Sequence, residues 1–356
     1  MKLPPRKPKE VIKISTTLLI DGDSLLKTAY HGAKRVYAND EHVGGIFQFY
    51  TILRKLIVEC NVDRVFIFWD GPESGKLRFS IYPEYKGNRK DYTYDGPSQD
   101  KSFDVQKIKV KQYAEELFIR QYEDITVEAD DCIAFYCANR KENEKIIICS
   151  NDRDLCQLLN DSVSIYLLDR KKVIDLDNYH EFFDHHPANA MLIKMIEGCD
   201  TDNIKGVVGV AESTLLKHVP ELRLEKIDLP TLLKKVNDIQ EERVKQKQSR
   251  LKALDNLLTG KTKGSQKDRL FEINQTLVDL SHPLITEECI EHIIHLMRQP
   301  IDPEGRDINN AIRMLMEDGI FEHIPGGKDG YIEFLMPFKK LIEKEKKEFT
   351  NKKELL

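Results

Sequence analysis

Short, almost wholly apolar runs alternate with helical patterns through the first half of the chain. Runs of this length are typical of strands buried on both faces of a parallel sheet. Between them, apolar residues recur at helical spacing, as at residues 47–58 and 130–140. The pattern predicts an α/β domain over residues 15–184, with a mostly parallel sheet flanked by helices. The four apolar runs cover residues 17–20, 65–69, 146–149 and 163–168.

The strand pattern stops after residue 184, and helical spacing continues alone. This change predicts a helical domain over residues 185–300, followed by a helical extension over residues 301–356. The basic, proline-rich residues 1–14 are expected to be a flexible tail, since no apolar segment of a secretory signal follows them. Residues 261–267 are expected to be a loop, and residues 339–353 a solvated charged helix or a disordered segment. The predicted helices cover residues 191–198, 212–218, 229–236 and 287–297.

Composition narrows the class of protein. The chain is 40% hydrophobic and 32% charged, and no apolar run approaches the ~20 residues that span a bilayer, so we expect no membrane partner. The net charge of −5 argues against a uniformly basic surface. Residues 243–269, however, hold nine basic and two acidic residues, a local charge of +7. The seven cysteines form no C-x-x-C pair, which favours reduced, buried thiols over a structural zinc site.

Aspartates follow three of the predicted strands. Asp21 and Asp70 end the first two, and Asp152 and Asp154 come directly after the third. The carboxyl ends of parallel strands meet at one edge of a sheet, where ligands bind. One such aspartate is usually a turn residue or a helix cap. Repetition on three strands favours a carboxylate cluster instead.

More acids fall at helix ends. Glu128, Asp130 and Asp131 open a predicted helix, and Asp130 shares a face with apolar residues three, four and seven positions later. An unpaired carboxylate on that buried face would be costly, whereas a cation would make the placement favourable. Asp200 and Asp202 follow a later helix.

Up to nine carboxylates could therefore converge, and they cannot all be ionised at close range without cations. Oxygen ligands of this kind suit Mg²⁺ or Mn²⁺, and two ions ~4 Å apart can activate a water and stabilise the leaving oxygen of a phosphodiester. His185 and His186, before Pro187, are expected to be surface or capping residues rather than ligands.

The order and spacing of these motifs resemble the flap endonuclease and 5′–3′ exonuclease family over roughly residues 17–300. The stand-alone bacteriophage flap endonucleases and phage ribonuclease H are the most similar members. The resemblance implies a PIN-like sheet domain, a helical arch at about residues 84–112, and a helix–three-turn–helix motif over residues 198–217. The motifs that carry it are Asp21-Gly22, residues 69–71, Arg78, residues 83–89, residues 128–131, residues 150–155 and residues 202–207.

The resemblance implies a metal-dependent 5′-nuclease that hydrolyses phosphodiesters at 5′ flaps and 5′ ends of DNA or RNA–DNA duplexes in replication or repair. Lys86 and Arg89 would contact the scissile phosphate as catalytic residues, and Tyr85 would stack on a base. Lys90, Gly206 and Gly209 would also contact nucleic acid, with a potassium ion at the turn. The implied ligands of two Mg²⁺ or Mn²⁺ ions are Asp21, Asp70, Glu128, Asp130, Asp131, Asp152, Asp154, Asp200 and Asp202.

The expected partners are branched or flapped DNA and RNA–DNA duplexes, with a single-strand-binding protein or a sliding clamp as a replication partner. We expect a monomer in the cytoplasm, or in the host cytoplasm if the chain is phage-encoded.

The sequence departs from the family pattern in two places. Cys199 stands where the first acid of the last motif is expected, and Asp200 is expected to substitute from the next position. In the following turn, Ala211 stands where the family prefers a glycine. Glu212 adds an acid that the family pattern lacks, and the lysine of the family pattern is absent. The departures weaken the expectation of tight duplex binding at the turn, and the basic window at residues 243–269 is expected to compensate.

Two other classes of function stay open. A haloacid-dehalogenase-type phosphatase would use Asp21 and Asp23 after the first strand, but it leaves Asp70 and the acids at 128–131 without a role. An inactive DNA-binding scaffold of the same fold would fit the departures at Cys199 and Ala211.

Overall fold

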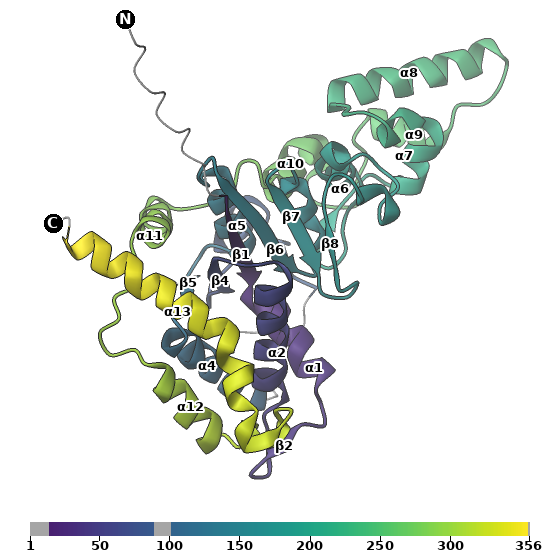
Figure 1. The fold of residues 1–356 in the computed structure, drawn as a ribbon. Coiled ribbons are helices and arrows are strands. Elements are labelled where there is room, and N and C mark those ends of the chain that lie inside the picture. The colour runs from purple at the N-terminus through teal and green to yellow at the C-terminus, as the bar shows by residue number, and fades with distance from the viewer. Residues whose placement is uncertain (1–13, 89–100, 355–356) are drawn as a thin grey trace, which may run out of the picture.

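The computed structural model describes residues 14–88 and 101–354. Across these residues six strands form the main sheet in the order β5-β4-β1-β6-β7-β8. Its strands pair in parallel except β8, which is antiparallel to β7. The expected mostly parallel sheet is confirmed (Figure 1). The strands are β1 (Ser15–Asp21), β4 (Arg64–Asp70), β5 (Arg120–Asp124), β6 (Glu144–Ser150), β7 (Val163–Leu167) and β8 (Lys172–Ile174).

The strand β5 has no apolar run, and the hydrophobic pattern therefore did not reveal it. It lies at one edge of the sheet, where polar side chains can find partners. Gln121 accepts a hydrogen bond from the indole of Trp69 at 3.2 Å. Arg120 is 3% exposed and forms a buried ion pair with Glu345. The polar sequence is thus satisfied by neighbours far away in the chain.

Side chains of the strands alternate between two hydrophobic cores. Leu18 and Ile20 point to one core and Leu19 points to the other, as the pleat requires. The first core is covered by α1 (Gly22–Gly32), α2 (Gly44–Glu59), α4 (Lys101–Glu116), α12 (Ile308–Glu317) and α13 (Tyr331–Glu354). The second core is covered by α5 (Ala129–Ala138) and α11 (Glu287–Arg298).

A third core holds the helical region, which extends away from the sheet in Figure 1. Two residues of the segment after α3 (Lys76–Ile81), Tyr82 and Tyr85, also pack into this core. Small two-stranded hairpins, β2 (Tyr37–Ala38) with β3 (Glu41–His42) and β9 (Gly198–Cys199) with β10 (Ile204–Lys205), complete the described strands. The helices of this region are α6 (Ala190–Glu197), α7 (Glu212–His218), α8 (Leu229–Lys245), α9 (Lys252–Leu258) and α10 (Leu270–Val278).

The segment at residues 339–353 is neither disordered nor simply solvated, which corrects the expectation. It belongs to α13, whose apolar residues Phe334, Phe338 and Leu341 are buried in the first core beside α2. The sequence did not reveal this buried apolar face because lysines and glutamates dominate the rest of the helix.

The packing also bears on the expected domains. Cys289 and Ile293 of α11 are buried in the second core, against α5 of the α/β domain. The helix α11 therefore packs with the sheet, although the sequence placed it in the helical domain at residues 185–300. The divisions at residues 184 and 300 stay predictions.

The seven cysteines are free thiols, and five of them are buried, in agreement with the expectation of reduced thiols. Among the described residues, no helix combines the length and apolar character needed to cross a membrane.

Candidate active site

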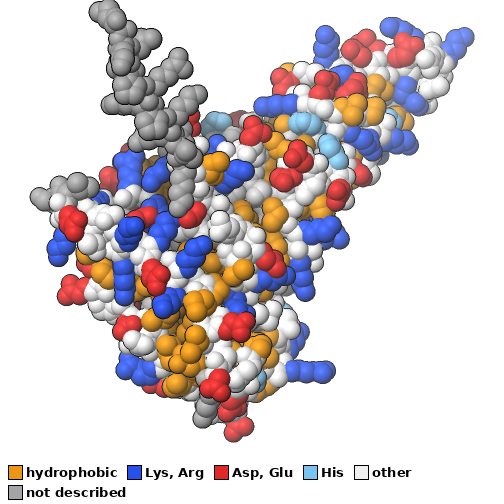
Figure 2. All heavy atoms as spheres, viewed as in Figure 1, with side chains coloured by type: hydrophobic (Ala, Val, Ile, Leu, Met, Phe, Trp, Pro, Cys, Tyr) orange, Lys and Arg blue, Asp and Glu red, His pale blue; other side chains and the backbone are white. Residues whose placement is uncertain are grey.

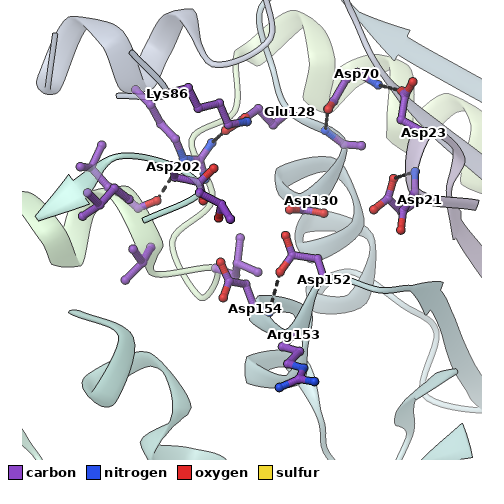
Figure 3. A pocket seen from close by; sticks show the side chains of 18 of the residues that line it. Asp21, Asp23, Asp70, Lys86, Glu128, Asp130, Asp152, Arg153, Asp154 and Asp202 are labelled. Atoms are coloured by element: carbon purple, nitrogen blue, oxygen red, sulfur yellow. Dashed lines mark hydrogen bonds and ion pairs between the residues drawn. The ribbon is translucent and has the colours of Figure 1, made fainter. Parts of the chain in front are cut away.

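A cleft of about 540 Å³ opens at the carboxyl edge of β1, β4 and β6. Figure 3 shows carboxylates pointing into it from several elements. Seven of the nine acids expected as ligands line it, together with Asp23. They are Asp21, Asp70, Glu128, Asp130, Asp152, Asp154 and Asp202.

Asp21 serves both as a helix cap and as a lining residue of the cleft. Its side chain caps α1 by accepting the backbone N–H of Ser24 at 3.0 Å. Its second oxygen accepts the hydroxyl of Ser150, at the end of β6, at 2.7 Å. Burial, and then the nearby Asp70, raise the pKa of Asp21 to about 7. The raised pKa indicates that neighbouring positive charge does not offset the burial of this carboxylate.

Asp70 sits beside a second acid, Asp23, that the sequence analysis did not assign to the metal site. Asp23 accepts the backbone N–H of Asp70 at 3.0 Å and is held by the ammonium of Lys107 at 2.9 Å. Asp70 itself accepts the backbone N–H of Ala129, at the start of α5, at 2.9 Å. Burial and then Asp23 raise the pKa of Asp70. Lys107 thus ties α4 to this edge of the cleft.

Glu128 is the most fully neutralised acid of the cleft. Its carboxylate pairs with Lys86 and, at 2.5 Å, with Arg78, and it accepts the hydroxyl of Tyr85 at 3.0 Å. Burial would raise the pKa of Glu128, but Arg78 and Lys86 outweigh it and hold the pKa below its ordinary value. Lys86 has a left-handed backbone (φ 53°), and its N–H donates to the carbonyl of Asp202 at 2.8 Å. The structure places Lys86 in the cleft, as expected.

Tyr85 does not present a free ring. Its side chain is 4% exposed and packs edge-on against Phe79. In this structure the buried ring offers no open face for a base, although Tyr85 lines the cleft, and its expected stacking role stays a prediction. Arg89 and Lys90 lie outside the described residues.

Asp152 and Asp154 open the short 3-10 helix η1 (Arg153–Leu158), with Asp152 accepting the N–H of Asp154 at 2.8 Å. Lys194 of α6 forms an ion pair with Asp154. Burial, and then Asp152, nonetheless raise the pKa of Asp154 to about 6.

Asp130 has no hydrogen-bond or ion-pair partner within the described part of the chain, and Figure 3 shows it between Asp152 and the group around Asp70. Burial, and then Asp152 and Asp21, raise its pKa well above the ordinary value. Behind it, Ile133 and Ala134 are buried, as the sequence predicted. The cleft thus presents an uncompensated carboxylate surrounded by others of the same charge.

Two of the expected ligands lie outside the cleft. Asp131 is 1% exposed and pairs with Arg78 at 2.5 Å, because neighbouring residues of a helix point about 100° apart. Asp200 is exposed in the turn of the β9–β10 hairpin, whose geometry directs Asp202 into the cleft instead. Cys199 donates to Asp202 at 3.3 Å and does not line the cleft. In this structure neither Asp200 nor Cys199 lies in the cleft at the place expected of the missing acid.

The turn after β10 contains the second departure from the family pattern, the added acid Glu212. Glu212, in the first turn of α7, is bound to His185 at 2.6 Å, and His185 also bonds the hydroxyl of Tyr179 at 2.9 Å. His185 is buried, which corrects the expectation of a surface residue, whereas His186 caps a short helix as expected. The side chain of Glu212 is therefore engaged by a partner within the protein.

The two glycines of the turn differ. A Cβ at Gly206 would lie 2.0 Å from the carbonyl oxygen of Glu197, so this glycine is required by close packing within the protein. Gly209 has φ 78° and open space around it, so its backbone is accessible.

The acids share a cleft without forming a compact site. Among the described residues, no group of three or more His, Cys, Asp or Glu side chains is close enough together to hold a metal ion. Lys86, Lys107 and Lys194 each form an ion pair with one acid of the cleft. The chemistry of the donor set still fits a hard divalent cation. Asp130 lacks a partner within the described part of the chain, and burial, followed by neighbouring carboxylates, raises the pKa values of Asp21, Asp70 and Asp154.

Sequence reasoning missed Asp23, Lys107 and Lys194. A signal was present for Lys194, the one cation inside the apolar run at residues 191–196. Lys107 carried no such signal, because its partner Asp23 is 84 residues away in the chain.

Comparison with known proteins places this arrangement in context. A family model described as the 5′-3′ exonuclease, N-terminal resolvase-like domain matches residues 16–184. A 5′-3′ exonuclease of Bacillus subtilis is 30% identical over 213 residues, which are 57% of this chain and 69% of that protein. A 5′-3′ exonuclease of Mycoplasmopsis pulmonis is 29% identical over 196 residues, 55% of this chain and 63% of that protein. DNA polymerase I of Bacillus subtilis is 27% identical, with only 26% of its length covered.

The fold has solved counterparts. The 5′-exonuclease of bacteriophage T5, solved with bound zinc, superimposes with a TM-score of 0.56 at 18% identity, covering 86% of this chain and 98% of that one. The bacteriophage T5 flap endonuclease, solved in complex with DNA and metal ions, gives a TM-score of 0.54 at 19% identity, covering 86% of this chain and 99% of that one.

Proposed function

Because the chain belongs to the 5′–3′ exonuclease family, we propose that it is a divalent-metal-dependent 5′-nuclease that cuts DNA or RNA–DNA duplexes at 5′ flaps and 5′ ends. The observation that carries the proposal is Asp130, a carboxylate that has no partner among residues 14–88 and 101–354 and lies among acids from three strand ends. We further propose that the protein acts in replication or repair and that it does so in the cytoplasm. The clamp or single-strand-binding partner, the monomeric state and the potassium ion stay predictions.

The lining acids would hold Mg²⁺ or Mn²⁺, in our proposal as two ions. The bound ions supply an activated water and stabilise the leaving oxygen. The acids in this role are Asp21, Asp70, Glu128, Asp130, Asp152, Asp154 and Asp202.

Lys86 is the protein's own cation for the reacting phosphate. Its backbone is fixed to Asp202, and its ammonium reaches the cleft from the same side as Glu128. A preorganised charge of this kind stabilises the developing negative charge without reorganisation. Arg89, three residues later, is proposed to act beside it.

The rival phosphatase gains no support from the geometry. A phosphatase would use Asp21 and Asp23 of the same loop and leave other lining acids, such as Asp70 and Asp130, without a role. Asp23, the other acid in that loop, is held by Lys107.

The test is incubation with a 5′-labelled flap duplex and an RNA–DNA duplex, with Mg²⁺, with Mn²⁺ and with chelator, followed by mapping of the products. We expect Mg²⁺- or Mn²⁺-dependent products cut at or near the junction. Binding without cutting in either ion would instead favour the inactive scaffold.

A further inference from the structure

The last residue of β4, Asp70, lies beyond the end of the neighbouring strand β1. The ladder between the two strands ends where Asp21 pairs with Phe68, and the chain then turns into α1. The backbone N–H of Asp70 therefore has no partner in β1. It donates instead to the side chain of Asp23, in the first turn of α1, at 3.0 Å (Figure 3). Asp23 thus continues the ladder with a side chain in place of a strand.

Close packing at the start of α1 brings Asp23 to this position. A Cβ at Gly22 would lie 2.4 Å from the ring of Trp69, so the absence of a side chain at Gly22 lets α1 begin against that ring. Trp69 directly precedes Asp70 in β4 and is buried. The start of α1 is therefore fixed against the residue next to Asp70.

The charge of Asp23 is balanced from a third element, α4. The ammonium of Lys107 lies 2.9 Å and 3.1 Å from the two carboxylate oxygens of Asp23, and 3.3 Å from the carbonyl oxygen of Asp70. It also lies 5.4 Å from the centre of the Trp69 ring, within the range of a cation–π interaction. Asp23 is 8% exposed, and a buried carboxylate without such a partner would be costly. The pair is therefore neutral as a whole and joins α4 to the end of β4.

Lys107 differs from a typical surface lysine. Exposed charges are mixed in sign over the face shown in Figure 2, and ion pairs between such groups contribute little. The side chain of Lys107, by contrast, is only 20% exposed and is engaged at the cleft. Lys111, one turn later in α4, lies over the same Trp69 ring at 5.3 Å, but it pairs with Glu123, at 2.7 Å, outside the cleft. Of these two lysines, Lys107 is the one that contacts an acid of the cleft.

Asp70 is consequently held from several sides. Its side chain accepts the N–H of Ala129, its own N–H donates to Asp23, and its carbonyl accepts from Lys107. Contacts of this kind orient a ligand for an ion, and their loss typically weakens metal affinity by about 10–100-fold. The contacts from Asp23 and Lys107 come from the two helices α1 and α4, which pack on the same face of the sheet.

We propose that Asp23 is a positioning residue for Asp70, with Lys107 as its counter-charge, so that α1 and α4 together set the place of this ligand in the cleft. The inference rests on the proposed function, in which Asp70 is a ligand. Because the pair is neutral, its contribution is the hydrogen bond to the N–H of Asp70 and not a net charge. Removal of the acceptor should therefore weaken ion binding, whereas removal of the two charges with the acceptor kept should not.

The experiment measures ion binding to the full chain without any substrate. Mn²⁺ is titrated by isothermal calorimetry into the wild type, D23A/K107M and D23N/K107M. The two variants have the same net charge and differ in whether residue 23 can accept a hydrogen bond. D23A/K107M should bind Mn²⁺ about tenfold more weakly than the wild type. D23N/K107M should stay within about threefold, since the asparagine oxygen can accept the same bond.

The matched control is K111M, which removes a lysine of the same helix that lies over the same ring and should bind Mn²⁺ as the wild type does. Circular dichroism should show all variants folded. If D23A/K107M does not fold, D23A alone tests the same bond, because Lys107 can turn to Glu123, 3.8 Å away. With a flap duplex, D23A/K107M should need about tenfold more Mn²⁺ for its half-maximal rate, with flap affinity in Ca²⁺ unchanged.

Three results would overturn the inference: wild-type Mn²⁺ affinity in D23A/K107M, equal losses in both double variants, or an equal loss in K111M. Equal losses in both double variants would make the charge of Asp23, and not its hydrogen bond, the important feature. A wild type that binds no Mn²⁺ would also overturn it, since Asp70 would then hold no ion. A wild type that binds Mn²⁺ with the expected pattern but leaves flaps uncut would refute the proposed function and not this role of Asp23.

Discussion

At the scale of single residues, the decisive distinction is between acids with and without internal partners. Glu128 and Asp131 share Arg78, while Asp130 faces other carboxylates. Three acids within four positions of the chain therefore have different environments. Helical geometry separates them, since each residue turns the side chain by about 100°.

The first prediction concerns Asp130→Asn. Cutting should fall at least about 100-fold, because the carboxylate is proposed to hold an ion needed in the transition state. Binding of a flap duplex in Ca²⁺ should stay within a few fold of wild type. In chelator the variant should melt a few degrees higher, since like-charge repulsion is removed. Single-turnover rates, binding constants and calorimetry measure the three effects.

Asp200→Asn is the control for that variant. Its side chain is exposed outside the cleft, so the Mg²⁺ concentration for half-maximal rate should not change. Cys199→Ser should behave in the same way. A large rise in the Mg²⁺ requirement of either one would restore it as a ligand.

The second prediction concerns Lys86→Ala. The cleavage rate should fall by about 100-fold, equivalent to about 2.7 kcal/mol of transition-state stabilisation. Duplex affinity should change little, since one contact among many is lost. Single-turnover rates at saturating enzyme, compared with binding constants, separate the two. Equal losses in rate and affinity would make Lys86 a general DNA contact.

At the scale of elements, the C-terminal helix α13 is attached to the sheet by charge as well as by apolar packing. Arg120 at the start of β5 pairs with Glu345, and both side chains are 2–3% exposed. Arg64 at the start of β4 pairs with Glu348 at 2.5 Å, and Lys344 with Asp63 at 3.1 Å. The helix therefore closes the end of the sheet opposite the cleft.

The third prediction follows from the burial of that pair. Glu345→Gln should lower the free energy of unfolding by about 3 kcal/mol, because it leaves the Arg120 guanidinium buried without a counter-charge. The double variant Arg120→Met/Glu345→Leu should recover most of the loss, since no buried charge remains. Urea denaturation of the three proteins measures this. A double variant less stable than Glu345→Gln would contradict the argument.

The sequence allowed prediction of those elements whose own residues show a clear local pattern of apolar and polar side chains. The four buried strands and the acids after them are examples, since each apolar run is complete within a few residues. It did not allow prediction of β5 or of the buried face of α13, because Arg120 and Glu345 look like surface residues until they are brought together. The same reason hid Lys107 and the burial of His185. Pairings over long sequence separation leave no local pattern.

At the scale of the whole molecule, stability and metal binding are linked. A cation that binds the folded cleft and not the unfolded chain stabilises the protein by about 2.7 kcal/mol at 100 times its dissociation constant. The fourth prediction is therefore a melting temperature that rises with Mg²⁺ or Mn²⁺ by about 3–4 °C at such concentrations. KCl of matched ionic strength should not reproduce it. Asp130→Asn should show a smaller rise, and an equal rise would place the binding elsewhere.

The attachment of α13 has a consequence for synthesis on the ribosome. The pair between Arg64 and Glu348 joins positions 284 residues apart, and that between Arg120 and Glu345 joins positions 225 apart. While the nascent chain lacks α13, the part of α2 that packs against α13 stays uncovered, and Arg120 lacks its partner Glu345. We expect ribosome-stalled chains ending before residue 331 to be digested by protease within the sheet domain, and chains that expose α13 beyond the exit tunnel to resist. Resistance of the shorter chains would show that the sheet domain matures without its final helix.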